Sequence, residues 1–508
     1  MSVAKKLASQ AAIYGVSSIV GRVLTYFLVS VYTARFAPAE YGIVTDLYAY
    51  VAFFNVLYTY GLETAYFRFA NRPGTDQARL YDQVLSLLLL SSALLSAGLL
   101  LLATPVVEAL RYPGQERYII WLAVILGIDS VVSIPFARLR LENRARKFAG
   151  VRLANTVVNV ALTLFFLVLC PDVLAGKYLP GLRPLVAAVY DPRLGVGYVF
   201  LVNLLANALY LPLLWRELSD FRFRPDWAGI PALWRYGYPI MIMGLAGMVN
   251  EMLSRLLLKY WLPEGFYPGQ SNLAALGVFG ACYKLSIFMQ LVIQAFRYAA
   301  EPFFFAQSNE QNSPATFALV LKWFTLCCAL IFVGVSLNLE WIGTLFLRRP
   351  EYREGLVVVP VLLLANLFLG VYYNLSVWFK LTDKTYYGTY ISLGGAVLTI
   401  ALNFLLIPVL GYLGSALATL ACYGMMAGVC WRLGEQHFPI PYPVARLAGW
   451  LLVACGVVAL GWFVPVAGYW PRQVWHGALC LGFAGLLALV EKPWRAAPGP
   501  LPAPRARQ

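Results

Sequence analysis

Charged side chains are scarce in this sequence: Asp, Glu, Lys and Arg together make up 12% of its 508 residues. A soluble protein of this length carries about twice that share. Histidine is rarer still, and with only His437 and His476 a histidine-rich metal site is excluded. The eight cysteines form no Cys-x-x-Cys pair and fall mostly in apolar stretches, where we interpret them as small hydrophobic side chains. We therefore expect no metal site.

Apolar residues, by contrast, are plentiful, at 60% of the chain with a mean hydropathy of +0.69. Apolar runs of about 20 residues recur from end to end, and each can cross a bilayer core of roughly 30 Å. The alternating pattern of a membrane β-barrel is absent. We predict an all-α integral membrane protein with about 14 transmembrane helices. The expected limits are 11–34, 43–67, 83–105, 118–138, 148–169, 195–215, 232–260, 273–298, 316–338, 356–379, 386–408, 412–432, 446–466 and 473–491.

The basic residues indicate how the chain lies in the membrane. Lys and Arg are more frequent in the loops after even-numbered spans, for example 138–147, than in those after odd-numbered spans. The positive-inside rule then places both termini in the cytoplasm. We attribute the net charge of +15 to this bias and expect no nucleic-acid partner. The first apolar run is too long for a signal peptide and is expected to remain as a helix.

A faint internal repeat divides the chain. The segment "YGIVTDLYAYVAFFN" of the second span aligns with "LGVFGACYKLSIFMQ" of the eighth, which pairs Gly42 with Gly277 and Tyr48 with Tyr283. Two six-helix units that start on the same side of a membrane are related by a pseudo-two-fold axis along the membrane normal. We therefore predict a first bundle at 1–220, a second at 221–437, and two appended helices with a cytoplasmic tail at 438–508.

Basic residues inside the spans are the strongest functional signal, because such groups are costly in a membrane and usually face a cavity or a partner. Arg22 lies near the middle of the first span, with no acidic residue on its own helix within reach. Arg255, Lys284 and Arg297 follow in the seventh and eighth spans. In a hydrated cleft such cations attract anions, and guanidinium groups fit phosphate oxygens.

Acidic and aromatic residues complete the set of candidates. Asp46, Glu63 and Glu251 are candidates for exchanging a proton or a sodium ion, and no other cofactor is expected. Tyr48 and Tyr283 offer aromatic faces for sugar rings, although aromatic residues also serve in helix packing and interfacial belts.

Structural roles compete with these interpretations. Glu251 and Arg255, four residues apart, could simply pair on one helix face, and Lys259 could extend to the membrane surface. Gly61 is a candidate kink, and the seventh span, rich in Gly and Pro, is the segment most expected to be a broken helix. The 25-residue loop "PDVLAGKYLPGLRPLVAAVYDPRLG" is expected to hold a short interfacial helix.

Two segments resemble a known family. "LNFLLIPVLGYLGSALATLACYG", Leu402 to Gly424, resembles the Asn-x-x-Leu-Ile-Pro-x-x-Gly-x-x-Gly hairpin of polysaccharide transporters. These form the O-antigen (Wzx-like) flippase family of the MATE-containing MOP superfamily. "ARFAPAEYGIVTDLYAY", Ala34 to Tyr50, is similar to the segment between the first two helices of that family. The matching residues are Pro38, Glu40, Tyr41, Gly42, Asn403, Pro408, Gly411, Gly414, Ala416 and Thr419.

The resemblance implies a transporter without catalytic residues. It would move an undecaprenyl diphosphate-linked oligosaccharide from the inner to the outer leaflet of the bacterial cytoplasmic membrane, by alternating access, in polysaccharide or O-antigen biosynthesis. The family's buried basic residues bind the diphosphate and acidic sugars, a role that the resemblance carries to Arg22, Arg255, Lys284 and Arg297. It also implies that the last two spans hold the lipid tail. The expected partners are the lipid-linked substrate, membrane lipids and polysaccharide-assembly proteins, with a monomer as the working unit.

Two other function classes are alternatives. A MATE-like drug exporter would need an acidic cavity for cations, whereas the buried excess here is basic. A membrane glycosyltransferase or polymerase would need catalytic acids or arginines on substantial outer loops. The only sizeable loop offers Asp172 and Asp191, without a paired-acid motif.

Overall fold

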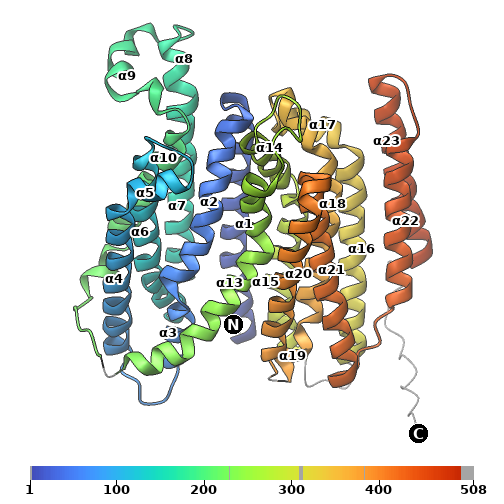
Figure 1. The fold of residues 1–508 in the computed structure, drawn as a ribbon. Helices are drawn as coiled ribbons and strands as arrows, with labels where there is room; N and C mark the ends of the chain where they lie inside the picture. Colours follow the sequence, from blue (N-terminus) through green and yellow to red (C-terminus); the bar gives the residue numbers. More distant parts are fainter. Residues whose placement is uncertain (1–2, 228, 308–312, 383, 493–508) are drawn as a thin grey trace.

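The computed structural model describes residues 3–227, 229–307, 313–382 and 384–492, and every regular element in those ranges is a helix (Figure 1). The first half comprises α1 (Val3–Arg35), α2 (Pro38–Thr59), α3 (Leu62–Ala70), α4 (Gln77–Leu101), α5 (Ala103–Ala109), α6 (Glu116–Leu141), α7 (Ala145–Leu164), η1 (Phe165–Leu169), α8 (Cys170–Leu174), η2 (Pro180–Leu182), α9 (Arg183–Val189), η3 (Pro192–Leu194), α10 (Gly197–Ala208), α11 (Tyr210–Leu213) and α12 (Trp215–Ser219). The second half comprises α13 (Ile230–Trp261), α14 (Asn272–Lys284), α15 (Ile287–Gln307), α16 (Ser313–Leu337), α17 (Leu339–Phe346), η4 (Pro350–Val357), α18 (Val358–Leu375), α19 (Val377–Leu381), α20 (Tyr386–Leu410) and α21 (Tyr412–His437), followed by α22 (Val444–Phe463) and α23 (Tyr469–Glu491).

The expected all-α membrane architecture is confirmed. Each of the 14 expected spans coincides with one helix or with consecutive helices. In the described part of the chain, ten helices are long and apolar enough to cross a membrane, or eleven if α14 and α15 form one bent span. The sixth expected span is a shorter apolar stretch, Gly197–Leu213. A count of fourteen is compatible with these helices.

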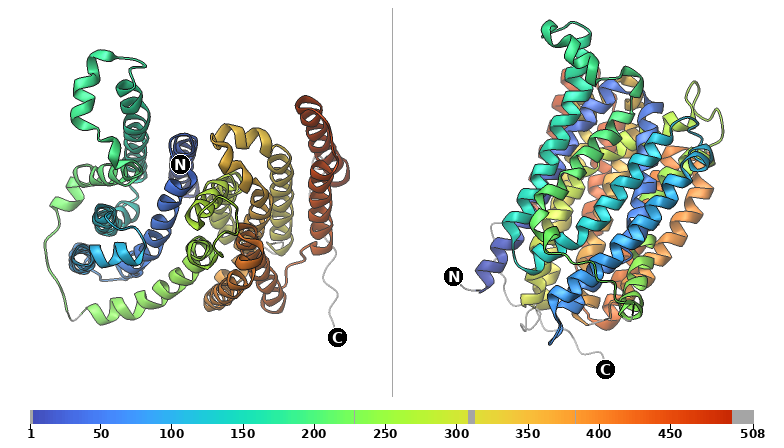
Figure 2. Two further views of the ribbon diagram at one scale, coloured as in Figure 1. Left: turned by 45° about the horizontal axis from the view of Figure 1, so that its top comes forward. Right: turned by 90° about the vertical axis from the view of Figure 1, so that its left-hand side faces the viewer.

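The helices form two groups that lie side by side, with α22 and α23 beside α16 at one end (Figures 1 and 2). The start of α1 and the end of α23 lie at the same face, here called the termini face, and the opposite face is called the far face. The tail expected after the last span, 473–491, lies outside the described residues from position 493 onward. The boundaries predicted at 220 and 437 stay predictions.

A buried carboxylate links the α22–α23 pair to the second half. Glu491 accepts hydrogen bonds from Arg446 at 2.6 Å and from the Trp450 indole at 2.7 Å, both on α22. Its other oxygen lies 2.5 Å from Nζ of Lys322 on α16. Glu491 therefore joins α22, α23 and α16 at the termini face.

The two halves meet at repeat-related glycines. A Cβ atom on Gly42 of α2 would collide with the carbonyl oxygen of Leu273, and one on Gly277 of α14 with the carbonyl oxygen of Pro38. The missing side chains thus let α2 and α14 cross with their backbones in contact. Gly42 and Gly277, which the sequence repeat aligns, therefore also lie next to each other in the structure.

Helix α13 bridges the halves. Near its start, Leu233 packs in the same core cluster as Tyr60 and Leu62 of the first half. Further along, Asn250 donates to the carbonyl oxygen of Ser392 at 3.2 Å, and its own oxygen accepts from Thr399 at 3.3 Å, both on α20. Figure 1 shows α13 running obliquely from one group of helices to the other.

The prediction of a broken seventh span is wrong, because α13 is one continuous helix of 32 residues with Pro239 inside it. The break lies in the eighth span, where α14 and α15 meet at a bend of 46°. Gly61 does interrupt the second span, as expected: it separates α2 from α3 at a φ of +77°, where a side chain would be strained.

The long loop projects beyond the other helices at the far face (Figures 1 and 2). Its short helix is α9, and α8 extends α7 outward. Asp172 anchors the loop, since it accepts hydrogen bonds from Tyr178 at 2.6 Å, Arg35 at 2.9 Å and Lys177 at 3.0 Å. Arg35 is the last residue of α1, so the loop is tied directly to that helix.

Candidate functional site

The break in the eighth span places a cation inside the helical assembly. Helix α14 ends at Lys284, and α15 starts at Ile287 after two residues whose side chains, Leu285 and Ser286, are buried. Carbonyl groups at a helix end carry partial negative charge, which favours a cation there. The Lys284 side chain is exposed, although those of its neighbours Tyr283 and Leu285 are buried.

Two arginines from other helices join Lys284. Arg22 of α1 and Arg255 of α13 both interact with it electrostatically. Arg22 is exposed and Arg255 is half-buried. We call Arg22, Arg255 and Lys284 the cation cluster. It draws on both halves, because α1 belongs to the first half and α13 and α14 to the second.

Arg255 is fixed by neutral partners. Its guanidinium lies 4.3 Å from the centre of the Tyr283 ring, and Nη1 is 2.9 Å from the sulfur of Met252. Its buried Nε has no hydrogen-bond partner. Tyr283 thus lies with the cation cluster as a cation–π partner.

The cation cluster is not neutralised by acids among the described residues, where no ion pair involves Arg22, Arg255 or Lys284. Glu251 lies one turn before Arg255 but forms no ion pair with it. It interacts electrostatically with the tyrosines Tyr283, Tyr373 and Tyr423 instead. The simple pairing of Glu251 with Arg255 is therefore not what the structure shows, and local positive charge exceeds negative.

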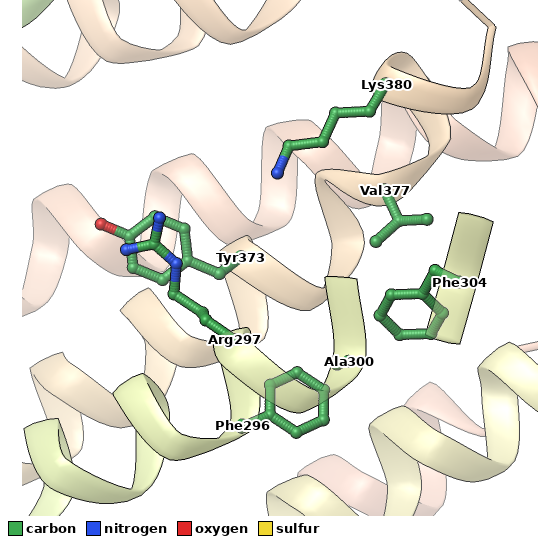
Figure 3. A pocket seen from close by; sticks show the side chains of 7 residues that line it. All are labelled: Phe296, Arg297, Ala300, Phe304, Tyr373, Val377 and Lys380. Carbon is green, nitrogen blue, oxygen red and sulfur yellow. The ribbon is translucent and has the colours of Figure 1, made fainter. Parts of the chain in front are cut away.

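Arg297 lies at a second level, nearer the termini face. It follows Lys284 by thirteen residues, or about 20 Å of helix. Its guanidinium stacks over Tyr373 of α18 at 4.2 Å from the ring centre. Figure 3 shows this pair beside Phe296 and Lys380, around a small cavity of about 20 Å³. Arg297 is thus separate from the cation cluster.

Tyr48 lies elsewhere. Its ring stacks on Phe200 at 5.7 Å between ring centres, inside the first half. It interacts electrostatically with Asp129, not with the cations. The repeat therefore pairs Tyr48 with Tyr283 in sequence, but the structure gives the two rings different surroundings, and a sugar contact for either stays a prediction.

Asp46 is buried in an ion pair between the halves. Its Oδ2 accepts from Nζ of Lys259 at 2.6 Å and from the Tyr112 hydroxyl at 2.7 Å, while Lys259 also donates to the carbonyl oxygen of Leu110 at 2.7 Å. Both charged side chains are buried, so the expected extension of Lys259 to the membrane surface is wrong. We call Asp46 and Lys259 the far-face ion pair.

The third acid, Glu63 on α3, forms an ion pair with Arg140 of α6 at the termini face. About a third of each side chain in this pair is exposed. Asp46, Glu63 and Glu251 therefore lie in three separate places, and an ion-coupling role for each stays a prediction.

The first half also contains a polar cluster whose residues were not among the candidate site residues. Asp129 of α6 accepts a hydrogen bond from Asn207 at 2.9 Å, and Asn207 accepts one from Asn155 at 3.1 Å. These residues come from α6, α7 and α10. Asparagines within apolar spans are the sequence signal, but their meeting point is visible only in the fold.

Comparison with known proteins supports this architecture. A family model described as "Polysaccharide biosynthesis protein" matches residues 33–175. No curated protein matches the sequence. The fold is similar to the lipid II flippase MurJ in an inward closed conformation, with a TM-score of 0.70, 12% identity, and 94% of this chain and 99% of that chain covered.

Two drug transporters share the fold as well. A multidrug resistance MATE family transporter of the MOP superfamily, in an inward-facing conformation, gives a TM-score of 0.63 at 12% identity, covering 84% of this chain and 96% of that chain. The MATE multidrug transporter DinF-BH gives 0.58 at 17% identity, covering 86% and 97%. The expected resemblance to a polysaccharide biosynthesis family is confirmed over residues 33–175, and the low identities to the solved transporters show a shared fold alone.

Proposed function

We propose that this chain, with its MOP-superfamily fold, is a flippase that moves an isoprenoid diphosphate-linked oligosaccharide across the bacterial cytoplasmic membrane. The substrate enters from the cytoplasmic leaflet and leaves in the outer leaflet. The single observation that carries the proposal is the cation cluster, in which Arg22 and Arg255 interact electrostatically with Lys284 and none of the three forms an ion pair with a described acid. The match to a polysaccharide biosynthesis family over residues 33–175 supports the substrate class.

Electrostatics explains why such a cluster is needed. Moving one ion from water into hydrocarbon costs on the order of 20 kcal/mol in idealised Born terms, so a diphosphate does not cross unaided. Guanidinium groups bind phosphate oxygens through paired hydrogen bonds, and an ammonium group adds charge. The three cations thus offset the headgroup charge inside the protein, while the isoprenoid stays in lipid. One chain supplies cations from both halves, so a monomer suffices.

Alternating access requires that the far face open. In the present state several contacts close it between the halves. The Thr33 hydroxyl donates to the carbonyl oxygen of Phe346 at 2.7 Å, and that of Tyr352 to the carbonyl oxygen of Phe36 at 3.0 Å. The far-face ion pair adds a buried charge interaction. Protonation of Asp46 would remove one charge of that pair, which provides a route by which an ion gradient could drive opening.

Drug export by the same fold is the less favoured function. A cationic drug needs a site with net negative charge, as in any cleft that concentrates cations. The cation cluster carries three positive charges, with Glu251 as the nearby acid. The chemistry of the cluster therefore favours an anionic substrate.

A flipping assay tests the proposal. The protein is reconstituted in liposomes with an isoprenoid diphosphate-linked oligosaccharide, and the lipid that reaches the opposite leaflet is labelled enzymatically. Arg255→Gln and Lys284→Gln should each slow flipping about tenfold or more, since a hydrogen bond to a charged group contributes roughly 1.5–3 kcal/mol. Arg146→Gln, an exposed arginine in the first turn of α7, is the matched control. Flipping that persists in the double variant would contradict the proposal.

A further inference from the structure

A second cavity lies at the termini face of the first half, and the cation cluster plays no part in it. Its volume is about 940 Å³, within the range of small-molecule sites, which is roughly 300–1,000 Å³. The start of α4, the end of α6 and the segment that joins the two halves, residues 220–226, form its walls. We call it the linker cavity.

All of the acids that line the linker cavity are already engaged. Asp76 accepts from the backbone of Ala78 and Arg79, Asp82 from the backbone of Arg222, Glu142 and Asp220 from Arg138, and Asp226 from Gln83, at distances of 2.7–3.2 Å. These carboxylates are therefore held by the protein itself, and Arg138 is neutralised by two of them.

Three lining arginines differ from Arg138. The side chains of Arg79, Arg222 and Arg224 are exposed, and none of them forms an ion pair or a side-chain hydrogen bond with another described residue. The linker cavity thus has three guanidinium groups without a side-chain partner. Asp76, Asp82 and Asp226 keep their charge, but backbone or amide N–H groups hold at least one oxygen of each.

The backbone holds two of these arginines in place. The N–H of Arg222 donates to Asp82 at 3.0 Å, and the N–H of Arg224 donates to the Ser86 hydroxyl at 2.8 Å. Both anchors are on α4. Both arginines line the cavity. The joining segment is thus fixed against α4 with its cations on the cavity side.

We propose that the linker cavity binds a phosphate-bearing anion through Arg79, Arg222 and Arg224. Guanidinium groups in a shared cavity suit phosphate oxygens, which accept paired hydrogen bonds. The phosphate can belong to the headgroup of an anionic phospholipid in the adjacent leaflet or to a soluble phosphate compound. Because residues 220–226 join the two halves, an occupied cavity braces the connection on which their relative movement depends.

Hydrogen exchange in nanodiscs tests this proposal. Protein with Arg255→Gln and Lys284→Gln is used, so that binding at the cation cluster does not contribute and the outcome is independent of the flipping assay. Inorganic pyrophosphate is added to phosphatidylcholine nanodiscs for the soluble source. For the lipid source, nanodiscs containing phosphatidylglycerol are compared with phosphatidylcholine alone. Amides of residues 76–83 and 220–227 should exchange more slowly with at least one probe, and the effective probe identifies the source.

The matched variants decide the assignment. Arg79→Gln, Arg222→Gln and Arg224→Gln together should weaken the protective probe at least tenfold, with an unchanged thermal transition. Each single variant should weaken it by a smaller factor. Arg146→Gln, outside the cavity, should leave it unchanged. Absence of protection with both probes, or full protection in the folded triple variant, would overturn the proposal.

Discussion

Nζ of Lys259 on α13 lies 2.6 Å from Oδ2 of Asp46 on α2, so a buried ion pair joins the two halves near the far face. Removing the lysine leaves a buried carboxylate without its cation, which costs roughly 3–5 kcal/mol. We predict that Lys259→Met shifts the protein toward a state open at the far face. Spin-label distances between α2 and α13 should lengthen and the thermal transition should fall.

An exposed ion pair at the same face provides the control. Arg472 and Glu340 lie 3.2 Å apart, each 44% exposed. Exposed pairs contribute roughly 0–1 kcal/mol, so Arg472→Gln should change neither the distances nor the transition appreciably. Equal effects of the two variants would mean that the far-face ion pair does not hold the halves together.

The glycine crossing gives a second prediction. Because a Cβ on Gly277 meets the backbone of Pro38, Gly277→Ala forces α2 and α14 apart. We expect a loss of about 1–3 kcal/mol in stability, the usual cost of overpacking. Gly424→Ala on α21 meets no atom within 4 Å and should be neutral. Thermal unfolding in detergent measures both, and two equal transitions would argue against a close crossing.

Tyr283 should matter through its ring rather than its hydroxyl. Its ring centre lies 4.3 Å from the Arg255 guanidinium, and a cation–π contact contributes roughly 0.5–2 kcal/mol. Tyr283→Phe should keep flipping near the parent rate, whereas Tyr283→Leu should lower it several-fold. The liposome assay compares the two, and a deficit in Phe as large as in Leu would assign the role to the hydroxyl.

Ion dependence should separate the acids. We predict that Asp46→Asn abolishes any proton or sodium dependence of flipping, because Asp46 lies at the contact between the halves. Glu63→Gln should retain it, since Glu63 pairs with Arg140 within the first half. Flipping rates under imposed pH and sodium gradients measure this. If the Asp46→Asn variant still flipped its substrate in an ion-dependent way, the prediction would be wrong, and Glu251 and Asp129 would be the remaining candidate acids.

Glu491 should hold the appended helices. Its carboxylate joins Lys322 and Arg446, so Glu491→Gln removes the charge that pairs with both. We expect faster hydrogen exchange along α22 and α23 and a lower thermal transition. Glu435→Gln is the control, because Glu435 and its partner Arg432 are both exposed and lie 3.9 Å apart. Unchanged exchange in Glu491→Gln would show that apolar packing alone attaches the pair.

Much of this fold follows from the sequence, because span length and apolar composition dictate helices in a membrane. The pairing of Gly42 with Gly277 was visible in the repeat, since close backbone contact tolerates only small residues. Gly61 likewise indicated the break between α2 and α3. These features depend on local chemistry, which a sequence displays directly.

Other features depend on residues that are far apart in the chain. Asp46 and Lys259 pair across 213 positions, so no spacing rule brings them together. The break after Lys284 lacks the Gly or Pro that marks most bends, and Pro239, which suggests one, lies inside a continuous helix. The sequence groups Arg22, Arg255, Lys284 and Arg297 as buried cations. Only the packing of the helices shows that the first three interact and that Arg297 lies with Tyr373 instead.

The bond from Arg35 to Asp172 makes the projecting loop an external reporter of α1. Arg22 lies on the same helix, so a shift of α1 during transport would be transmitted outward to α8 and α9. A fluorophore attached to the exposed loop would then register each cycle from the aqueous side, well away from the path of the substrate.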